Sequence, residues 1–494
     1  MSFKRRRISY ELGPAAGPRN ARWDARKETA EALLDGGLPY SRKLCGHTEC
    51  VNALVLSRSG RWLASGGDDP HILLWDFHQG DLKEPSKRFL GHRDSVLDLS
   101  CHPQQDEIFL SASDDGCTIL HDMRAASTLT RAQGTLQHDA EMTCVQFHPE
   151  MEHIFVTGDI RGELCLRDTR MAFGPKSRRL NKGVVRKFVT TITKPTMRHL
   201  SNPELSSVTF DSTGTKLAAT MALFGPTIYK TSDPYPIAVC AATTLPDGSP
   251  IPEGERTYAN SCTIKHGSFG GGGLLDDPYY CAGSDDFRAY MWKLPPLAEL
   301  ALRRREVSMD DWSNEDPNTV AFAESKSGPR HIPITLSRPT ARLAGHRSIV
   351  NTALMHPTFP AILTAGIERN ILLHSPTPAT PFMPSSSLSV TPAEVRTLPA
   401  EETPESRLLA SRARGTTLTI WDDEPEDDSM SIALFDQILR QESGADVFET
   451  RRWSVEEDDD EDEDEDEAED RDETEDEDDE DEDMYETMAY VDAT

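Results

Sequence analysis

Apolar and polar residues alternate along much of the chain in short runs, which is the pattern of β-strands with one buried face. Two 16-residue stretches, 109–124 (FLSASDDGCTILHDMR) and 155–170 (FVTGDIRGELCLRDTR), show this pattern most clearly. Each begins with Phe, carries Gly at its eighth position, continues into an apolar alternation and ends in Asp-x-Arg. The pair therefore predicts two copies of one strand-turn-strand unit, with an arginine at the end of each last strand.

Dipeptide signposts extend this unit into a repeat with a period of about 45 residues. The signposts are Gly-His at 46–47, 91–92 and 345–346, Gln-His at 137–138, His-Pro at 102–103, 148–149 and 356–357, and Trp-Asp at 75–76. Such a period with these signposts is typical of WD repeats, each of which forms one four-stranded blade of a β-propeller. We therefore expect an all-β fold, a WD-repeat β-propeller over residues 44–376.

Six blades are legible in the sequence, and we expect seven in the ring, the commonest number for WD repeats. A candidate for the missing piece is a half-blade at 405–424, whose segment 409–422 (LASRARGTTLTIWD) has the length and ending of two blade strands. The long insertion 295–340 is the other place where a blade could be hidden.

Most of the signpost residues have a structural interpretation. In WD repeats the Gly-His histidine, a strand Ser or Thr, a turn Asp and a strand Trp form a hydrogen-bonded set inside the blade. The residues that match are His47, Ser65, Asp69 and Trp75 in the first repeat, His92, Ser111 and Asp115 in the second, Asp286 and Trp292 in the fifth, and His346 in the sixth. His121 and Arg167 replace Trp in the second and third repeats. Because buried polar groups need partners, we assign these histidines to the blades and not to a ligand.

Four segments flank the propeller. They are an N-terminal extension 1–43 with a short helix at 20–34, a Pro/Ser/Thr-rich linker at 377–404, an amphipathic helix at 429–442 and an acidic tail at 455–494. Each helix could pack on its own domain or bind a partner. The tail has too much charge and too little apolar area to fold, so it is expected to be disordered.

The formal charge of −32 belongs mainly to that tail, because residues 456–486 hold 26 acids and one Arg. The nine cysteines form no C-x-x-C pair, which argues against a disulfide framework or zinc site and favours a reducing compartment. We found no catalytic motif, and we expect no metal or cofactor. The chain is therefore expected to be a non-catalytic interaction protein.

Location follows from the same features. No apolar run approaches the ~20 residues of a membrane span, so no membrane is expected as a partner. Direct nucleic-acid binding is disfavoured by the acidic balance and by the small size of the basic clusters at 4–7 and 303–305. The first of these clusters could act as a nuclear import signal. We expect the protein in the nucleus, in the cytoplasm or in both.

The paired stretches resemble the box ending in W-D-x-R of WD-repeat substrate receptors of cullin-4 RING ubiquitin ligases, the DDB- and cullin-4-associated factor family. Further stretches that support the resemblance are GHTECVN at 46–52, SGGDD at 65–69, DPYPIAVC at 233–240, SCTIK at 261–265, GSDDFRAYMW at 283–292 and GHRSIVN at 345–351. The resemblance covers roughly residues 44–376 and extends weakly to 430–442.

The resemblance implies that the box docks on the ligase adaptor, the large subunit of the damaged-DNA-binding protein, and that an unknown protein substrate is recruited for ubiquitination. The implied adaptor-binding residues are Asp122, Arg124, Asp168 and Arg170. Arginine suits such a contact because its planar fork holds carboxylate or carbonyl groups with several hydrogen bonds. A local Asp–Arg ion pair is the alternative for each box.

A second hypothesis from a different class is a chromatin or histone-binding scaffold. Its support is the acidic tail, which can attract histones or other basic proteins through long-range electrostatics.

Overall fold

The computed structural model describes residues 18–450, with gaps at 45–50, 57–61, 68–70, 77–86, 91, 125–133, 139, 176, 178, 273, 275, 357–358, 369–370, 379–387, 393, 416–427 and 443. The acidic tail and the basic cluster 4–7 lie outside the described residues.

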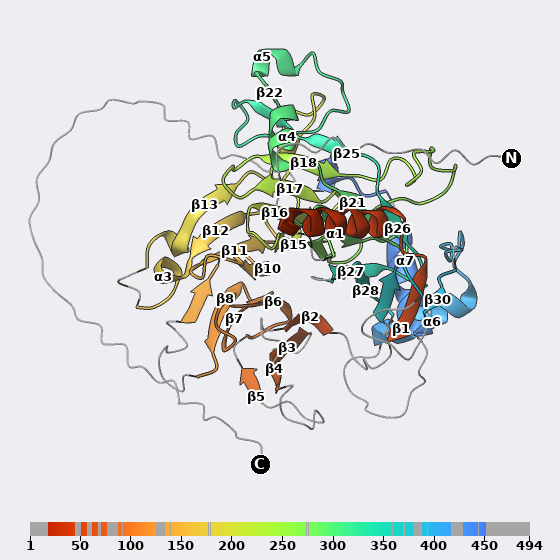
Figure 1. Ribbon diagram of the computed structural model, residues 1–494, viewed down its shortest axis with the longest axis horizontal. Helices are drawn as coiled ribbons and strands as arrows, with labels where there is room; N and C mark the ends of the chain where they lie inside the picture. The colour runs from red at the N-terminus through yellow and green to blue at the C-terminus, as the bar shows by residue number, and fades with distance from the viewer. Residues whose placement is uncertain are drawn as a thin grey trace, which may run out of the picture. The chain divides into compact units, whose positions relative to one another are not determined.

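Six sheets follow one another along the chain, each with the strand order of a blade (Figure 1). Blade 1 contains β2 (Val51–Leu56), β3 (Trp62–Gly67), β4 (His71–Asp76) and β5 (Lys87–Leu90). Blade 2 contains β6 (Val96–Cys101), β7 (Ile108–Ser113), β8 (Cys117–Asp122) and β9 (Thr135–Gln137). Blade 3 contains β10 (Met142–Phe147), β11 (Ile154–Asp159), β12 (Leu164–Asp168) and β13 (Val184–Phe188). Blade 4 contains β15 (Leu205–Phe210), β16 (Lys216–Met221), β17 (Thr227–Lys230), β18 (Pro236–Cys240) and the parallel strand β25 (Ile334–Leu336). Blade 5 contains β19 (Gly267–Gly270), β20 (Tyr279–Gly283), β21 (Ala289–Lys293) and β26 (Ala341–Leu343).

The first strands of successive blades contact one another in the series β2, β6, β10, β15, β19 and β27. Side chains of these strands also bond to the backbone of the next blade. Asp98 on β6 accepts a hydrogen bond from the Val145 amide at 2.9 Å, and Ser268 on β19 accepts one from the Met355 amide at 2.7 Å. The all-β propeller expected from the repeats is thus confirmed.

Blade 6 is completed by the beginning of the chain. It contains β27 (Val350–Met355), β28 (Ile362–Gly366), β29 (Ile371–Ser375), β1 (Tyr40–Leu44) and β30 (Ser389–Val390). Strand β1 pairs antiparallel with β29, from Tyr40 opposite Ser375 to Leu44 opposite Ile371. The propeller therefore begins four residues earlier than residue 44, and the linker 377–404 contributes the edge strand β30. Both corrections arise because strand pairing is long-range and leaves little trace in local sequence.

A seventh sheet is present among the described residues, but it has a different strand order from a blade. It joins β14 (Ile192–Thr193), β23 (Ala321–Phe322), β24 (Arg330–Ile332) and β22 (Arg305–Val307), and three of these strands come from the insertion 295–340. The insertion also contains α4 (Leu297–Arg303) and α5 (Met309–Trp312). Since β10 of blade 3 contacts β15 of blade 4 directly, this sheet does not stand between them as a blade.

The candidate half-blade at 405–424 is wrong over the residues described there, because α6 (Pro404–Gly415) is a helix. Thr403 caps it by accepting a hydrogen bond from the Ser406 amide, and Pro404 follows at the first helical position, where proline is tolerated. The segment 407–413 consists of strong helix formers apart from one serine, so local propensity favours the helix. The resemblance of residues 416–422 to a blade strand lies outside the described residues.

Two more helices follow, α7 (Ser429–Glu442) and α8 (Val447–Thr450), and both pack on the propeller. Leu439 of α7 lies in a cluster with Phe287 and Ile349, from blade 5 and from the loop before blade 6. The guanidinium of Arg396 donates to the buried Asp436 carboxylate of α7 at 2.9 and 2.5 Å. The buried residues of α7 are Ile432, Ala433, Asp436 and Leu439. The sequence predicts an apolar face of Met430, Leu434, Ile438 and Leu439, of which Leu439 is buried and the other three are half-buried. Packing against α6 on the other side explains why both faces are partly covered.

Candidate functional site

The hydrogen-bonded set of blade 2 is complete, with a histidine in the position of the usual tryptophan. His92 Nδ1 lies 3.2 Å from the Asp115 carboxylate, and His92 Nε2 lies 2.6 Å from Ser111 Oγ. Ser111 Oγ is in turn 2.9 Å from His121 Nε2. His121 stacks on Phe109 with 4.4 Å between the ring centroids, so its ring replaces the packing of an indole as well as its hydrogen bond.

Blade 6 repeats this arrangement with conservative exchanges. His346 Nδ1 lies 3.1 Å from Glu368 Oε2, and His346 Nε2 lies 2.8 Å from Thr364 Oγ1. Thr364 Oγ1 is 2.8 Å from Nε2 of the fully buried His374. The chain thus uses one design twice, acid–His–hydroxyl–His. The same histidines that could be mistaken for metal ligands are engaged inside their blades.

These histidines predict a pH dependence of stability. Burial lowers the pKa of both His121 and His374 to about 3, whereas unfolded histidine titrates near ~6.5. Between these values the unfolded chain binds protons that the folded blades do not, so stability present above pH ~6.5 is lost as the pH falls. From pH 7 to 5 each histidine should cost about 2 kcal/mol, as measured by urea unfolding.

The variant His121→Trp separates this effect from other titrations. Between pH 7 and pH 5 this variant should lose less unfolding free energy than the unmodified chain, by the amount that one histidine contributes. This difference does not depend on how the substitution changes stability at pH 7. An unchanged difference between the two pH values would show that His121 becomes protonated inside the fold.

In blade 3 a buried arginine stands where the tryptophan would be. Arg167 is 3 % exposed; its Nε donates to Thr157 Oγ1 at 2.9 Å and its Nη1 to the Lys182 carbonyl at 2.8 Å. The first bond matches the hydroxyl contact of His121 and His374 in their blades. The second reaches outside the blade, to a turn that follows the third strand.

Blade 5 departs from the sequence interpretation, because Asp286 and Trp292 do not belong to one hydrogen-bonded set. Ala282 occupies the position of the linking hydroxyl, so nothing connects the two residues. Trp292 Nε1 donates to the Ala241 carbonyl at 2.7 Å, and Asp286 accepts from Tyr290 Oη at 2.6 Å and Arg288 Nη1 at 3.0 Å.

In place of a connected hydrogen-bonded set, blade 5 contains a buried ion pair. Lys265 Nζ lies 2.6 Å from Asp285 Oδ1, and both side chains are fully buried. The other carboxylate oxygen, Oδ2, accepts hydrogen bonds from the amides of Ser261 and Cys262. Asp285 therefore fixes the loop that enters the blade.

The set proposed for blade 1 cannot be placed. His47 and Asp69 lie outside the described residues, and for Ser65 and Trp75 the structure describes the strand backbone alone, in β3 and β4.

The two Asp-x-Arg endings have the same geometry. Arg124 donates from Nε and Nη2 to the Asp122 carboxylate, both at 3.0 Å, and its amide donates to Asp122 Oδ1 at 3.0 Å. Arg170 donates to Asp168 in the same way, at 3.0 and 2.6 Å from Nε and Nη2 and 2.9 Å from the amide. Each aspartate therefore fixes both the turn and the plane of the guanidinium.

The arginines are exposed while the aspartates are mostly covered. Exposed fractions of the side chains are 52 % for Arg124 and 66 % for Arg170, against 19 % for Asp122 and 9 % for Asp168. Hydrogen bonds from the arginines lower the pKa of both carboxyls, so both are ionised at neutral pH. Among the described residues neither Nη1 has a hydrogen-bond partner, so this edge of each fork is available to another molecule.

Both arginines lie on one edge of the propeller, the edge at which the third strands end, which we call the arginine rim. β8 and β12 belong to adjacent blades and end at equivalent positions, because Asp122 pairs with Ile108 and Asp168 with Ile154 (Figure 1). The turn at Glu152 joins them: its carbonyl lies 2.8 Å from His102 Nε2 of blade 2, and its charge contributes to the raised pKa of Arg170. Equivalent strand ends in adjacent blades therefore place the two boxes on one rim.

The N-terminal helix α1 (Pro18–Asp35) ends on the same rim. Leu34 is buried in a cluster with Tyr279 and Met291 of blade 5, and Asp35 accepts hydrogen bonds from Tyr279 Oη and Lys293 Nζ, both at 2.7 Å. Lys293 ends the third strand of its blade, opposite Tyr279. Residues 24–29 of the helix are exposed. The helix therefore packs on its own domain by its C-terminal part and presents an uncovered stretch beside the rim.

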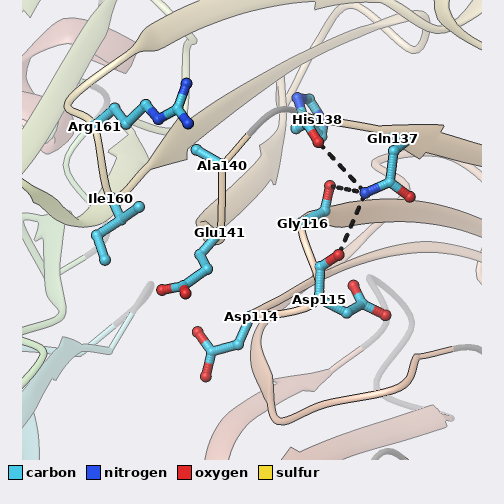
Figure 2. A pocket seen from close by; sticks show the side chains of 9 residues that line it. All are labelled: Asp114, Asp115, Gly116, Gln137, His138, Ala140, Glu141, Ile160 and Arg161. Atoms are coloured by element: carbon cyan, nitrogen blue, oxygen red, sulfur yellow. Dashed lines mark hydrogen bonds between the residues drawn. The ribbon is translucent and has the colours of Figure 1, made fainter.

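The opposite rim has a different character. A hollow of about 340 Å³ lies between blades 2 and 3 (Figure 2). It is lined by the strand turns at Asp114–Gly116 and Ile160–Arg161 and by Gln137, His138, Ala140 and Glu141. Burial and the nearby carboxylates of Glu141 and Asp94 raise the pKa of Asp114 to about 6. α7 and α8 also pack on this rim, α8 through hydrogen bonds of its carbonyls with Ser201 and His199.

Searches for other site types gave negative results for the part of the chain that is described. No group of three His, Cys, Asp or Glu side chains there could hold a metal ion. No described helix combines the length and apolar character needed to cross a membrane. The seven described cysteines are free thiols.

Comparison with known proteins agrees with the fold. The family model "WD domain, G-beta repeat" matches residues 39–76 and 83–122. The mouse and human proteins named DDB1- and CUL4-associated factor 5 are each 29 % identical over 389 residues, which cover 68 % of this chain and 34 % of theirs. A rice protein, chromatin assembly factor 1 subunit FAS2 homolog, is 37 % identical over 103 residues, 20 % of each chain.

The fold and these matches define the chain as a WD-repeat β-propeller protein. Within that class it is homologous to DDB1- and CUL4-associated factor 5, so the family resemblance found in the sequence is confirmed. The chain spans about a third of the length of these relatives.

Sequence reasoning missed three features of the site. The Lys265–Asp285 pair gave no signal because neither residue belongs to a WD signpost. The role of Arg167 in holding a turn could not be read, since its acceptor is a backbone carbonyl 15 residues away. The surface on which α1 docks could not be read, although the buried Ala30 and Leu34 are four residues apart and lie on one helix face.

Proposed function

We propose that this protein is a substrate receptor of a cullin-4 RING E3 ubiquitin ligase. It would carry no catalysis itself and would bind the ligase adaptor DDB1 through the arginine rim. The observation that supports this most directly is the pair of identical Asp-x-Arg forks, exposed on one rim of adjacent blades. The relatives named as DDB1- and CUL4-associated support the same partner.

The geometry divides the box residues into two roles. Arg124 and Arg170 are the contact residues, because they are exposed and offer an unused Nη1 edge. Asp122 and Asp168 are positioning residues, since their carboxylates are occupied by the arginine forks and by backbone amides. A fork held in place loses less side-chain entropy on binding than a free arginine does. The local ion pair and partner docking are therefore compatible, and the first prepares the second.

The exposed part of α1 belongs to the same proposed interface. Its residues 24–29 are exposed and precede the section that packs on blade 5, where the third strand ends at Lys293. The opposite rim and the insertions are left for the substrate, whose identity the site does not define. The experiment is co-purification of the tagged full chain with endogenous DDB1 and cullin-4 from cells; a chain that purifies without either would contradict the proposal.

A histone-binding scaffold is the second candidate, and one structural observation favours it. The hollow on the rim opposite the arginines is lined in part by Asp114, Asp115 and Glu141. This hollow and the 26 acids of residues 456–486 would each offer negative charge to a basic partner, in the nucleus or in the cytoplasm. The rice relative is named as a chromatin assembly factor subunit, over a match limited to 20 % of this chain.

Deleting residues 456–486 tests this candidate. With purified core histones at about 50 mM salt, the deletion should weaken binding about tenfold or more, because the tail attracts basic surfaces over long distances. The difference should vanish near 0.5 M salt, where screening shortens that range. Equal binding of the two chains at low salt would remove the tail from the mechanism.

A further inference from the structure

The turn that follows the second arginine is strained. Asn181, Lys182 and Gly183 adopt φ angles of 45°, 49° and 76°, three successive residues in the left-handed region. Residues other than glycine rarely adopt this conformation, and it persists only where the surroundings impose it. Strain of this kind concentrates at sites where a side chain must be presented in one position.

Several contacts impose this conformation. Arg167, the residue in the tryptophan position of blade 3, donates to the Lys182 carbonyl at 2.8 Å. The Leu180 amide donates to the Met171 carbonyl of α3 (Thr169–Ala172) at 3.1 Å. A Cβ on residue 183 would lie 2.5 Å from the Ala172 Cβ. Only glycine at this position therefore lets the turn approach α3 so closely.

The turn presents a leucine to solvent beside the exposed arginine. The exposed fraction of Leu180 is 63 %, and its backbone bonds to Met171, the neighbour of Arg170 in sequence. Of the eight large apolar side chains that are exposed among the described residues, three belong to blade 3: Met151 at 45 %, Leu180, and Val185 at 56 %. The Met151 turn is tied to α3, because the Thr169 amide donates to the His153 carbonyl.

The charge of this segment is opposite to that of the whole chain. Residues 170–187 carry seven Lys or Arg and no Asp or Glu, in a protein with a formal charge of −32. A basic, partly apolar surface fits a partner that offers carboxylate or carbonyl oxygens around an apolar recess. A purely acidic partner would match the basic charges of this surface but would leave its apolar side chains uncovered.

We propose that Leu180, with the exposed Met151 and Val185 of the same blade, forms an apolar shelf that extends the arginine rim and inserts into the adaptor next to the groups bound by Arg170. This inference rests on the proposed function. Arg167 in the tryptophan position then serves two contacts: its Nε keeps the hydroxyl contact of the blade, and its Nη1 fixes the turn that carries the shelf.

The test measures the affinity of the purified full chain for purified DDB1 by titration, for the unmodified chain and for three single variants. Leu180→Glu should raise the Kd about tenfold or more, because it places a charge in an apolar recess. Leu180→Met should bind within about twofold of the unmodified chain, since it keeps an apolar side chain of similar volume. Leu302→Glu is the matched control, because Leu302 on α4 is 86 % exposed and belongs to the insertion 295–340 and not to blade 3.

The outcomes separate the two proposals. If the unmodified chain binds and Leu180→Glu binds as well as Leu302→Glu, the shelf is wrong and the proposed function stands. If the unmodified chain does not bind DDB1, the proposed function fails and the shelf fails with it. Thermal unfolding of Leu180→Glu should match that of Leu302→Glu, because both side chains are solvent-exposed.

Discussion

A chain in which Arg124 and Arg170 are both replaced by Ala is expected to bind DDB1 at least 100-fold more weakly than the unmodified chain. Exposed arginines that become buried in an interface are among the residues whose truncation weakens binding most. Here each fork is already held by its aspartate, so little ordering is required and each contact should contribute strongly. Titration of the purified full chain against DDB1 measures the effect directly.

The matched control for the arginine pair is Arg303→Ala on α4. Arg303 is 57 % exposed and pairs with Glu299 four residues earlier, so it resembles Arg124 in exposure and in having a carboxylate partner. It should change the affinity less than twofold. Undiminished binding of the Arg124→Ala, Arg170→Ala chain would assign the two forks to local structure alone and would move the adaptor contact elsewhere.

The second large effect concerns stability. Replacing Lys265 by Ala should lower the free energy of unfolding by about 3–5 kcal/mol, because it leaves the Asp285 carboxylate buried without its cation. Urea unfolding followed by tryptophan fluorescence gives the value, since Trp292 of the same blade is fully buried. The loop at Ser261 and Cys262 should lose its fixed conformation at the same time, because the amides of both residues bond to Asp285.

Two comparisons define what the Lys265 result means. Lys187→Ala removes one partner of an exposed ion pair with Glu163, and should cost less than about 1 kcal/mol. Replacing Lys265 by Met and Asp285 by Leu together should recover only part of the loss: no buried charge is left, but the amides of Ser261 and Cys262 lose their acceptor. A Lys265→Ala chain as stable as Lys187→Ala would mean that water reaches Asp285.

The parts of the fold that the sequence predicted are those encoded within one repeat. The acid–His–hydroxyl–His sets of blades 2 and 6 could be located because their members recur at fixed spacing in the sequence. The Asp-x-Arg turns could be located for the same reason, since the aspartate bonds to the amide two residues later. Local spacing and local chemistry agree at these places, which is the condition under which sequence reasoning succeeds.

The parts that could not be predicted depend on residues far apart in the chain. The pairing of β1 with β29 carries no local signal beyond a short alternating strand. α6 was mistaken for strands because 416–422 (TTLTIWD) resembles the end of a blade, although Thr403 and Pro404 begin a helix. Asp286 and Trp292 stand at the expected spacing, but Ala282, at the position of the linking hydroxyl, has no group that would connect the set. Spacing alone therefore overstated how far the blade design is kept.

The pairing of β1 with β29 has a consequence for biogenesis. The ribosome makes β1 first, but its partner strand emerges only after nearly the whole propeller has been synthesised, and closing so long a loop is slow. α1 is joined to β1 and ends on a surface built from blade 5 and blade 6 residues, so it cannot reach its place before the last blade exists. A truncated or stalled chain would lack the composite surface of helix and arginines. Assembly with a partner at that surface would thereby be reserved for molecules in which the last blade of the propeller has formed.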